Sequence, residues 1–427
     1  MGLNNIKKSI TKTFLELTSF QMLAMFRRGL FYTYLSMYMR NFLLLPMTIV
    51  SLYATFPMLM SVFFQNVVWG PISDKFQKRR TLIILGEILA GIGTIIVWFI
   101  HSGFNNFLFA GWVIIIGLTC IEAFWSMSNI GWSALISDIY PSKDRSRIMG
   151  QLTSFGGLGR IIGVLIGGYL YDNGFGFRNG SLFFIASFVM FISTLPMFWA
   201  PEGGINNSIV DEQKEDMINE NKANTKFKRI FAVFIISLVF INFGRNSIAT
   251  TYSPFLSLSS GFDLDPVIIG YIANTRSIAV IIIGFCAAFL SRKLGHSKTL
   301  IFGIFLAIAA LIITALTSSV FLIFVGSFFI GAGEVIIYAS SYTIASNLIP
   351  ERIRAKLFGV YNATFFLSWG LPSTILLAPL IDILTPSVGQ NFAYQVSFIV
   401  AAIITGLGLL IFTLLEIWIK IKKIKKK

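Results

Sequence analysis

The chain consists of long apolar runs separated by short polar breaks. A membrane-spanning helix needs about 20 mostly apolar residues, and runs of that length recur along the whole sequence. Dividing them at charged and at Gly-, Pro- or Asn-rich breaks predicts twelve spans. They cover approximately residues 17–39, 47–70, 81–101, 107–138, 148–171, 181–200, 229–256, 266–291, 298–317, 320–348, 356–381 and 393–418.

A long polar segment separates the sixth span from the seventh. It begins at Pro201 and contains the charged run Asp211–Asp216. We therefore predict an N-terminal six-helix bundle over residues 1–200, a linker over 201–228, and a C-terminal six-helix bundle over 229–427 that ends in a basic tail.

The two halves show a weak internal repeat. Phe26–Gly29 precedes the similar Phe243–Asn246 by 217 residues, and the same offset aligns Asp74 with Ser291. Two parallel six-helix repeats related by an axis along the membrane normal are one of the known transporter architectures. The predicted fold is therefore an all-α polytopic membrane protein of twelve helices.

Composition excludes the main alternatives to a helical membrane protein. The chain is 55% hydrophobic and 12% charged, whereas soluble domains carry about 25% charged residues. Transmembrane barrels alternate apolar and polar residues, a pattern that these continuous apolar runs lack. Cys120 and Cys286 both lie inside apolar runs, so no disulfide framework is predicted.

The net charge of +15 is unevenly placed. Of the 34 lysines and arginines, Arg40 and Arg178 fall on one predicted side, and five lie inside spans: Arg27, Arg28, Arg160, Arg245 and Arg276. All the others share the side of the two termini and the linker. By the positive-inside rule that side is cytoplasmic. The charge thus indicates topology in the cell membrane and attraction to anionic lipid, not a nucleic-acid partner.

The loop after the second span carries a recognisable motif. Gly70–Arg80 resembles the Gly-x-x-x-Asp-(Arg/Lys)-x-Gly-(Arg/Lys)-(Arg/Lys) loop of the major facilitator superfamily, although Gln77 or Lys78 stands where that loop has its second glycine. The resemblance implies twelve-helix secondary transport. It also implies that Asp74 latches the two halves, since a carboxylate is favoured at a helix N-terminus. The implied gating residues are Gly70, Asp74, Lys75, Arg79 and Arg145; anchoring of topology alone is the simpler interpretation of the basic ones.

The fifth span carries a second motif, built of glycines. Their spacing resembles the antiporter motif of the same superfamily, with Val164 in place of its proline. The resemblance implies a drug or metabolite antiporter, although the fourth span lacks the arginine that drug–proton antiporters usually carry. The alternative is close helix packing, which small residues permit in lipid. The residues concerned are Gly150, Gly159, Gly163, Gly167 and Gly168.

Carboxylates inside the spans are candidates for carrying a coupling proton, because ionisable residues at membrane depth are costly and mark functional sites. Glu122 in the fourth span and Glu334 in the tenth are the predicted proton-coupling residues. Burial and a neighbouring arginine act in opposite directions on a carboxyl pKa, so substrate and proton can exclude each other there. Glu87, in the third span, is assigned a structural role.

The intramembrane arginines suggest where a substrate binds. Arg28 and Tyr32 share one helical face, and Asn246 and Thr250 form a polar face beside Arg245. We predict these five residues to bind substrate. A guanidinium suits carboxylate or phosphate, and the arginine pair resembles the anion clamp of organophosphate exchangers. The structural alternative is that each arginine is neutralised by a glutamate on a facing helix. Arg27, about 100° around the helix from Arg28, is assigned a structural role.

Taken together, the sequence predicts an alternating-access transporter that exports an amphipathic small molecule in exchange for protons. The alternative is an exchanger or symporter of a phosphorylated or carboxylated metabolite bound by Arg28 and Arg245. No phosphate-binding loop or catalytic triad order is evident, so no enzyme activity and no cofactor are predicted. His101 and His296 lack a ligand set, so no metal is expected. We expect a monomer; substrate, direction and coupling ion are not defined by the sequence.

Overall fold

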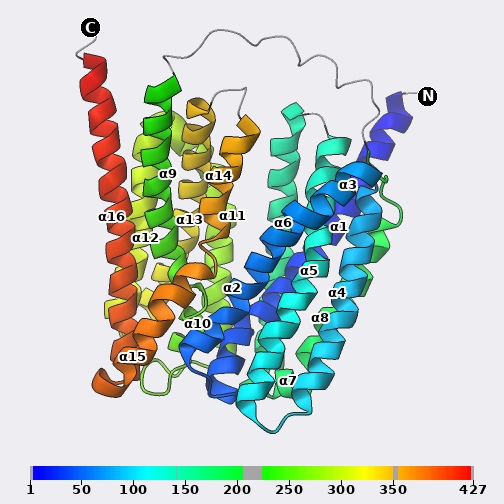
Figure 1. Cartoon of the computed structure of the whole chain (residues 1–427), viewed down its shortest axis with the longest axis vertical. Helices are drawn as coiled ribbons and strands as arrows, with labels where there is room; N and C mark the ends of the chain where they lie inside the picture. Colours follow the sequence, from blue (N-terminus) through cyan, green and yellow to red (C-terminus); the bar gives the residue numbers. More distant parts are fainter. Residues whose placement is uncertain (1–2, 141, 205–223, 350–353, 425–427) are drawn as a thin grey trace. The chain divides into compact units, whose positions relative to one another are not determined.

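The computed structural model describes residues 3–140, 142–204, 224–349 and 354–424, and the described part is helical without strands (Figure 1). Every predicted span falls on one or more helices. In the first half these are α1 (Leu3–Met37), α2 (Met47–Phe64), α3 (Gly70–Phe76), α4 (Arg79–Ser102), α5 (Phe107–Ile139), α6 (Ser142–Tyr171), α7 (Phe175–Arg178) and α8 (Ser181–Met197). In the second half they are α9 (Asn224–Asn246), α10 (Tyr252–Leu256), α11 (Pro266–Leu294), α12 (His296–Leu316), α13 (Val320–Leu348), α14 (Arg354–Phe366), α15 (Ala378–Val388) and α16 (Gln390–Ile424).

Nine helical stretches of the described residues are long and apolar enough to cross a membrane. The seventh and eleventh predicted spans differ from the expectation of one continuous helix each. A 3₁₀ turn, Ser247–Ala249, separates α9 from α10, and a π-helical segment, Ser373–Leu377, leads into α15. At the first break, the side chains of Asn246 and Thr250 form hydrogen bonds with residues of the eleventh span. Gly370 and Pro372 lie at the second break, where proline removes a helix hydrogen bond.

Residue contacts divide the chain into two compact units. The first contains Met1–Leu45, Thr55–Asp216 and Pro266–Tyr271, and the second contains Pro46–Ala54, Met217–Asp265 and Ile272–Lys427. The first residues of α2 and of α11 thus group with the unit opposite to their predicted bundle. Residues 205–223 of the predicted linker lie outside the described part, so the predicted domain boundaries stay a prediction.

In the first unit α1 packs along α6 and α8, and α4 packs along α5 and α8. Glycines bring α1 and α6 unusually close, because a Cβ at three positions of α6 would collide with a backbone oxygen of α1. Gly159, Gly163 and Gly167 face, in that order, the carbonyl oxygens of Met22, Phe26 and Leu30.

The two ends of the glycine series have different surroundings. Gly168 lies against the hydroxyl of Tyr34, which donates to the carbonyl of Val164 at 2.7 Å. Gly150 has open space where its Cβ would be. Close backbone approach therefore explains the middle of the motif and leaves Gly150 unexplained.

In the second unit α9 and α12 both pack against α16, and α12 also packs along α13. Its core is aromatic and aliphatic. Phe231, Phe234, Ile304, Tyr361 and Phe412 are among its buried members. The buried polar and charged side chains of the two units lie within these apolar interiors.

Candidate functional site

Three helices of the first unit bring four charged residues into one buried region. Arg27 and Arg28 come from α1, Glu87 from α4 and Glu122 from α5. Trp125 of α5 lies among them. The guanidinium carbons of Arg27 and Arg28 lie 4.1 and 4.5 Å from the centroid of its ring, which is cation–π distance.

The indole of Trp125 also holds Glu87. Its Nε1 donates to Glu87 Oε1 at 2.7 Å, and Ser128 Oγ donates to the same oxygen at 2.9 Å. The second carboxylate oxygen, Oε2, is buried and has no hydrogen-bond partner. Glu87, predicted to be structural, therefore has one anchored oxygen and one that is not satisfied by the protein.

Glu122 lies within electrostatic range of Arg27, Arg28 and Glu87. The four charged residues sum to zero. The N-terminal unit thus contains a balanced set of charges, in which both arginines are stacked on one tryptophan.

A cavity of about 170 Å³ opens beside this cluster. Its lining residues come from α1, α4 and α5 and are Phe20, Gln21, Ala24, Met25, Arg28, Glu87, Trp125, Ser128, Asn129 and Trp132. Tyr32, predicted to join Arg28 at the substrate, instead lines a separate, smaller pocket together with Arg27. Arg27, predicted to point away from Arg28, reaches the same indole ring.

The second unit contains a direct ion pair. Arg276 of α11 donates to Glu334 Oε2 of α13 from Nε at 3.1 Å and from Nη2 at 2.7 Å. The side chains of Arg276 and Glu334 are 21% and 27% exposed. Trp369 lies 5.7 Å from the guanidinium. The predicted proton-coupling Glu334 therefore has an arginine partner.

The predicted polar face of the seventh span is occupied by helix–helix hydrogen bonds. Asn246 Nδ2 donates to Ser368 Oγ at 2.7 Å, and the hydroxyls of Thr250 and Ser373 bond each other. Arg245 Nε donates to Asn242 Oδ1 at 3.0 Å. Asn246 and Thr250 are buried. Substrate binding by Arg245, Asn246 and Thr250 stays a prediction.

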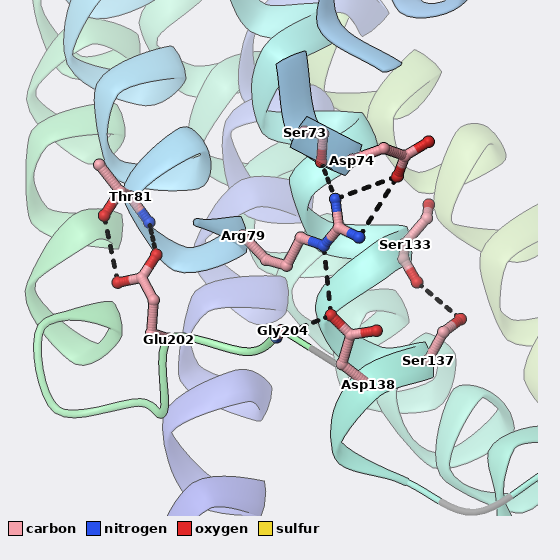
Figure 2. Close-up of polar contacts among 9 residues, drawn as sticks. All are labelled: Ser73, Asp74, Arg79, Thr81, Ser133, Ser137, Asp138, Glu202 and Gly204. Atoms are coloured by element: carbon pink, nitrogen blue, oxygen red, sulfur yellow. Dashed lines mark hydrogen bonds and ion pairs between the residues drawn. The ribbon is translucent and has the colours of Figure 1, made fainter. Parts of the chain in front are cut away.

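The motif loop forms a network around Arg79 (Figure 2). Arg79 is 4% exposed. It donates through Nη1 to Ser73 Oγ at 2.5 Å, through Nη1 and Nη2 to Asp74 Oδ1 at 3.3 Å, and through Nε to Asp138 Oδ2 at 3.2 Å. Asp74 has a side chain that is 81% exposed, whereas that of Asp138 is 10% exposed.

The start of the linker closes the same network. Glu202 accepts from the backbone N–H of Thr81 at 3.0 Å and from its hydroxyl at 3.1 Å, so it caps the first turn of α4 from a distant part of the chain (Figure 2). Gly204 donates its N–H to Asp138 Oδ2 at 3.0 Å.

The other predicted gating residues lie at the edge of this network. Gly70 begins α3, and the Lys75 ammonium lies 5.6 Å from the ring of Phe76. The side chain of Arg145 lies outside the described residues.

The sequence analysis identified the charged residues more often than the residues that contact them. Asp138 and Glu202 were not predicted, and Trp125 was considered only as an aromatic residue that could line a cavity. Asp382 was also missed: it accepts from the backbone N–H groups of Met47 and Thr48, at 2.9 and 2.7 Å. An acid at the end of the fourth span, opposite a basic loop, is the signal that identifies Asp138. No group of three or more His, Cys, Asp or Glu residues in the described ranges is arranged to hold a metal ion.

Known proteins resemble this chain in sequence. The family model described as Major Facilitator Superfamily matches residues 17–373 and 235–427. The chain is 26% identical over 302 residues to the "Multidrug resistance protein MdtG" of Yersinia enterocolitica, covering 70% of this chain and 68% of that protein. A protein of the same name from Proteus mirabilis is 26% identical over 297 residues, covering 69% of each.

Solved structures resemble the fold. The nucleoside transporter NupG superposes with a TM-score of 0.72 at 14% identity, covering 94% of this chain and 98% of its own. A bacterial homologue of the human lysosomal transporter Spinster, in an inward-facing unoccupied conformation, gives a TM-score of 0.68 at 15% identity, covering 95% and 97%. At these identities the likeness concerns the fold alone.

Proposed function

The chain belongs to the Major Facilitator Superfamily of membrane transporters, and from this premise we propose that it exports an amphipathic small molecule in exchange for protons. The multidrug resistance proteins at 26% identity support export of such compounds. The two halves rock about a site near the bilayer midplane to give alternating access. The protein then works as a monomer in the cell membrane, with both termini in the cytoplasm and lipid around its spans.

The observation that carries proton coupling is a carboxylate placed beside arginine in each unit. Glu334 pairs with Arg276, and Glu122 lies in the field of Arg27 and Arg28. A nearby arginine favours the charged carboxylate, whereas desolvation favours the protonated one. A change of hydration or of arginine position during the cycle therefore binds or releases a proton, which is the event that coupling requires.

The competing hypothesis is exchange of an anionic metabolite held by Arg28 and Arg245. It receives less support, because Arg28 shares its cavity with the carboxylate of Glu87. A purely anionic ligand would meet that negative charge at close range. Arg245, for its part, is bonded to Asn242.

Gradient-driven transport in proteoliposomes tests the proposal. With a fluorescent amphipathic dye and an imposed pH gradient, the wild-type protein should accumulate dye. Glu122→Gln and Glu334→Gln should lose that accumulation and keep dye counterflow without a gradient, because only the proton step is removed.

Glu416→Gln is the matched control, since Glu416 accepts from Ser297 and has no arginine among its described partners. Wild-type accumulation in both test variants would sink the coupling assignment. Thermal stabilisation by phosphorylated or carboxylated anions, lost in Arg28→Ala and Arg245→Ala, would establish the anion exchanger instead.

A further inference from the structure

The cavity of the N-terminal unit is lined by one acid, Glu87, and one arginine, Arg28. We propose that it binds the charged end of a compact aromatic zwitterion, with the ammonium at Glu87 and the anionic group at Arg28. The inference rests on the proposed function only in taking this ligand as the transported class.

Glu87 supplies the first step. Its side chain is 1% exposed, and Oε1 already accepts from Trp125 and Ser128. Oε2 has no partner, and an unsatisfied buried polar atom is destabilising. An ammonium group on a ligand provides the missing donor in a charge-assisted hydrogen bond. The residue lines the cavity, and because Oε2 is itself shielded, a ligand ammonium reaches it when the carboxylate turns toward the cavity.

Arg28 supplies the second step. Its guanidinium is positioned by stacking on Trp125 at 4.5 Å, and Trp125 is itself fixed by its bond to Glu87. Arg28 also lines the cavity. A planar guanidinium is the preferred protein partner of a carboxylate or phosphate.

Charge balance decides between ligand classes. Arg27, Glu87 and Glu122 lie within electrostatic range of Arg28, and the four groups sum to zero while Glu122 is ionised. A cation or an anion alone would add an uncompensated charge to a buried region, which is costly. A zwitterion leaves the sum unchanged while satisfying both unlike groups.

The other residues that line the cavity indicate the chemistry of the uncharged part of the ligand. Phe20, Met25 and Trp132 are apolar or aromatic, and Gln21 and Asn129 add neutral amides. The rings of Phe20 and Trp132 pack at 5.1 Å. A cavity of about 170 Å³ lined in this way suits one ring attached to a short charged end.

Three matched ligands test the proposal on the detergent-purified full-length chain. Phenylalanine carries both charges, 2-phenylethylamine only the ammonium, and 3-phenylpropionate only the carboxylate. Binding is measured by calorimetry and by thermal stabilisation, which follows occupancy of the folded state. Phenylalanine should bind roughly tenfold or more tightly than either partner compound, because a site built for a polar group rejects an analogue that lacks it.

Two variants assign the charges. Glu87→Gln keeps an acceptor for Trp125 and Ser128, and it should reduce phenylalanine binding to the level of 3-phenylpropionate. Arg28→Gln should reduce it to the level of 2-phenylethylamine. Glu416→Gln, in the other unit, is the control and should leave all three affinities unchanged. Equal binding of amine and zwitterion, no binding of any of the three, or no effect of Glu87→Gln overturns the proposal.

Dye export by the same variants in proteoliposomes separates the two ideas. Gradient-driven export without a zwitterion preference overturns only the inference about this cavity. A zwitterion preference that depends on Glu87, together with no gradient-driven export of any ligand, overturns only the proposed function.

Discussion

At the scale of single residues, Trp125 organises the buried charges of the first unit. The guanidinium groups of Arg27 and Arg28 stack on its ring, and its indole N–H donates to Glu87. Replacing it with phenylalanine keeps an aromatic ring and removes the donor.

We expect Trp125→Phe to lower the free energy of unfolding by about 1–3 kcal/mol, the cost of leaving a buried acceptor short of a bond. Trp132→Phe is the matched control, since Trp132 lines the same cavity and no described acceptor is bonded to its indole nitrogen. Denaturant unfolding in detergent measures both variants. Equal losses in the two would mean that ring volume, not the N–H, is what the site requires.

The ion pair of the second unit offers a second residue-scale prediction. Arg276 donates two hydrogen bonds to Glu334, and both side chains are partly exposed. An ion pair that is not fully buried contributes modestly to stability. In a double-mutant cycle of Arg276→Gln and Glu334→Gln, we expect a favourable coupling energy of about 0.5–1.5 kcal/mol, toward the lower part of the range for contacting residues. Additive effects of the two substitutions would show that the pair contributes nothing to stability.

At the residue scale the sequence shows which residues are charged at membrane depth, but not which residues they contact. Charged residues at membrane depth are conspicuous, and Glu334, Arg276 and Arg28 were all singled out. Helical spacing, however, defines only a face. Whether Tyr32 joins Arg28 depends on which neighbouring helix each side chain meets, and that depends on the tertiary packing of α4 and α5.

At the scale of elements, the contact of α1 with α6 depends on glycine. Phe26 presents its carbonyl oxygen where a Cβ at Gly163 would be, whereas Gly150 has open space. Gly163→Ala should therefore destabilise the protein by roughly 1–3 kcal/mol, the usual cost of overpacking. Gly150→Ala should be neutral or slightly stabilising, because alanine favours helix. Comparison of their unfolding midpoints is the measurement; a neutral Gly163→Ala would contradict tight packing.

Elements were predictable where hydropathy alone defines them. The long helices α4, α5, α12 and α13 begin and end within about three residues of the predicted spans. The breaks in the seventh and eleventh spans were not predicted. They coincide with hydrogen bonds that join the two segments, among them Asn246 with Ser368. A hydropathy pattern averages over such polar positions and does not show where they interrupt a helix.

At the scale of the whole molecule, the fold followed from the sequence because membrane burial leaves few alternatives to helices. The transport cycle is harder to predict from the sequence than the fold is, because the cycle involves several conformations with different contacts. Asp74 illustrates this point. It bonds Arg79 from an exposed position, whereas Asp138 bonds the same guanidinium from a buried one.

Asp74 should therefore matter more to the cycle than to the stability of this conformation. An exposed ion pair contributes about 0–1 kcal/mol, so Asp74→Asn should leave the thermal midpoint nearly unchanged while it slows dye transport several-fold. Asp138→Asn should lower the midpoint, because it leaves Arg79 and the Gly204 N–H with a weakened buried partner. Midpoints and initial transport rates of the two variants, with Asp74→Glu as the charge-conserving control, make the comparison. Wild-type transport by Asp74→Asn would remove the gating role and leave the loop as a determinant of topology, because a carboxylate that alters neither stability nor rate has no part in the cycle.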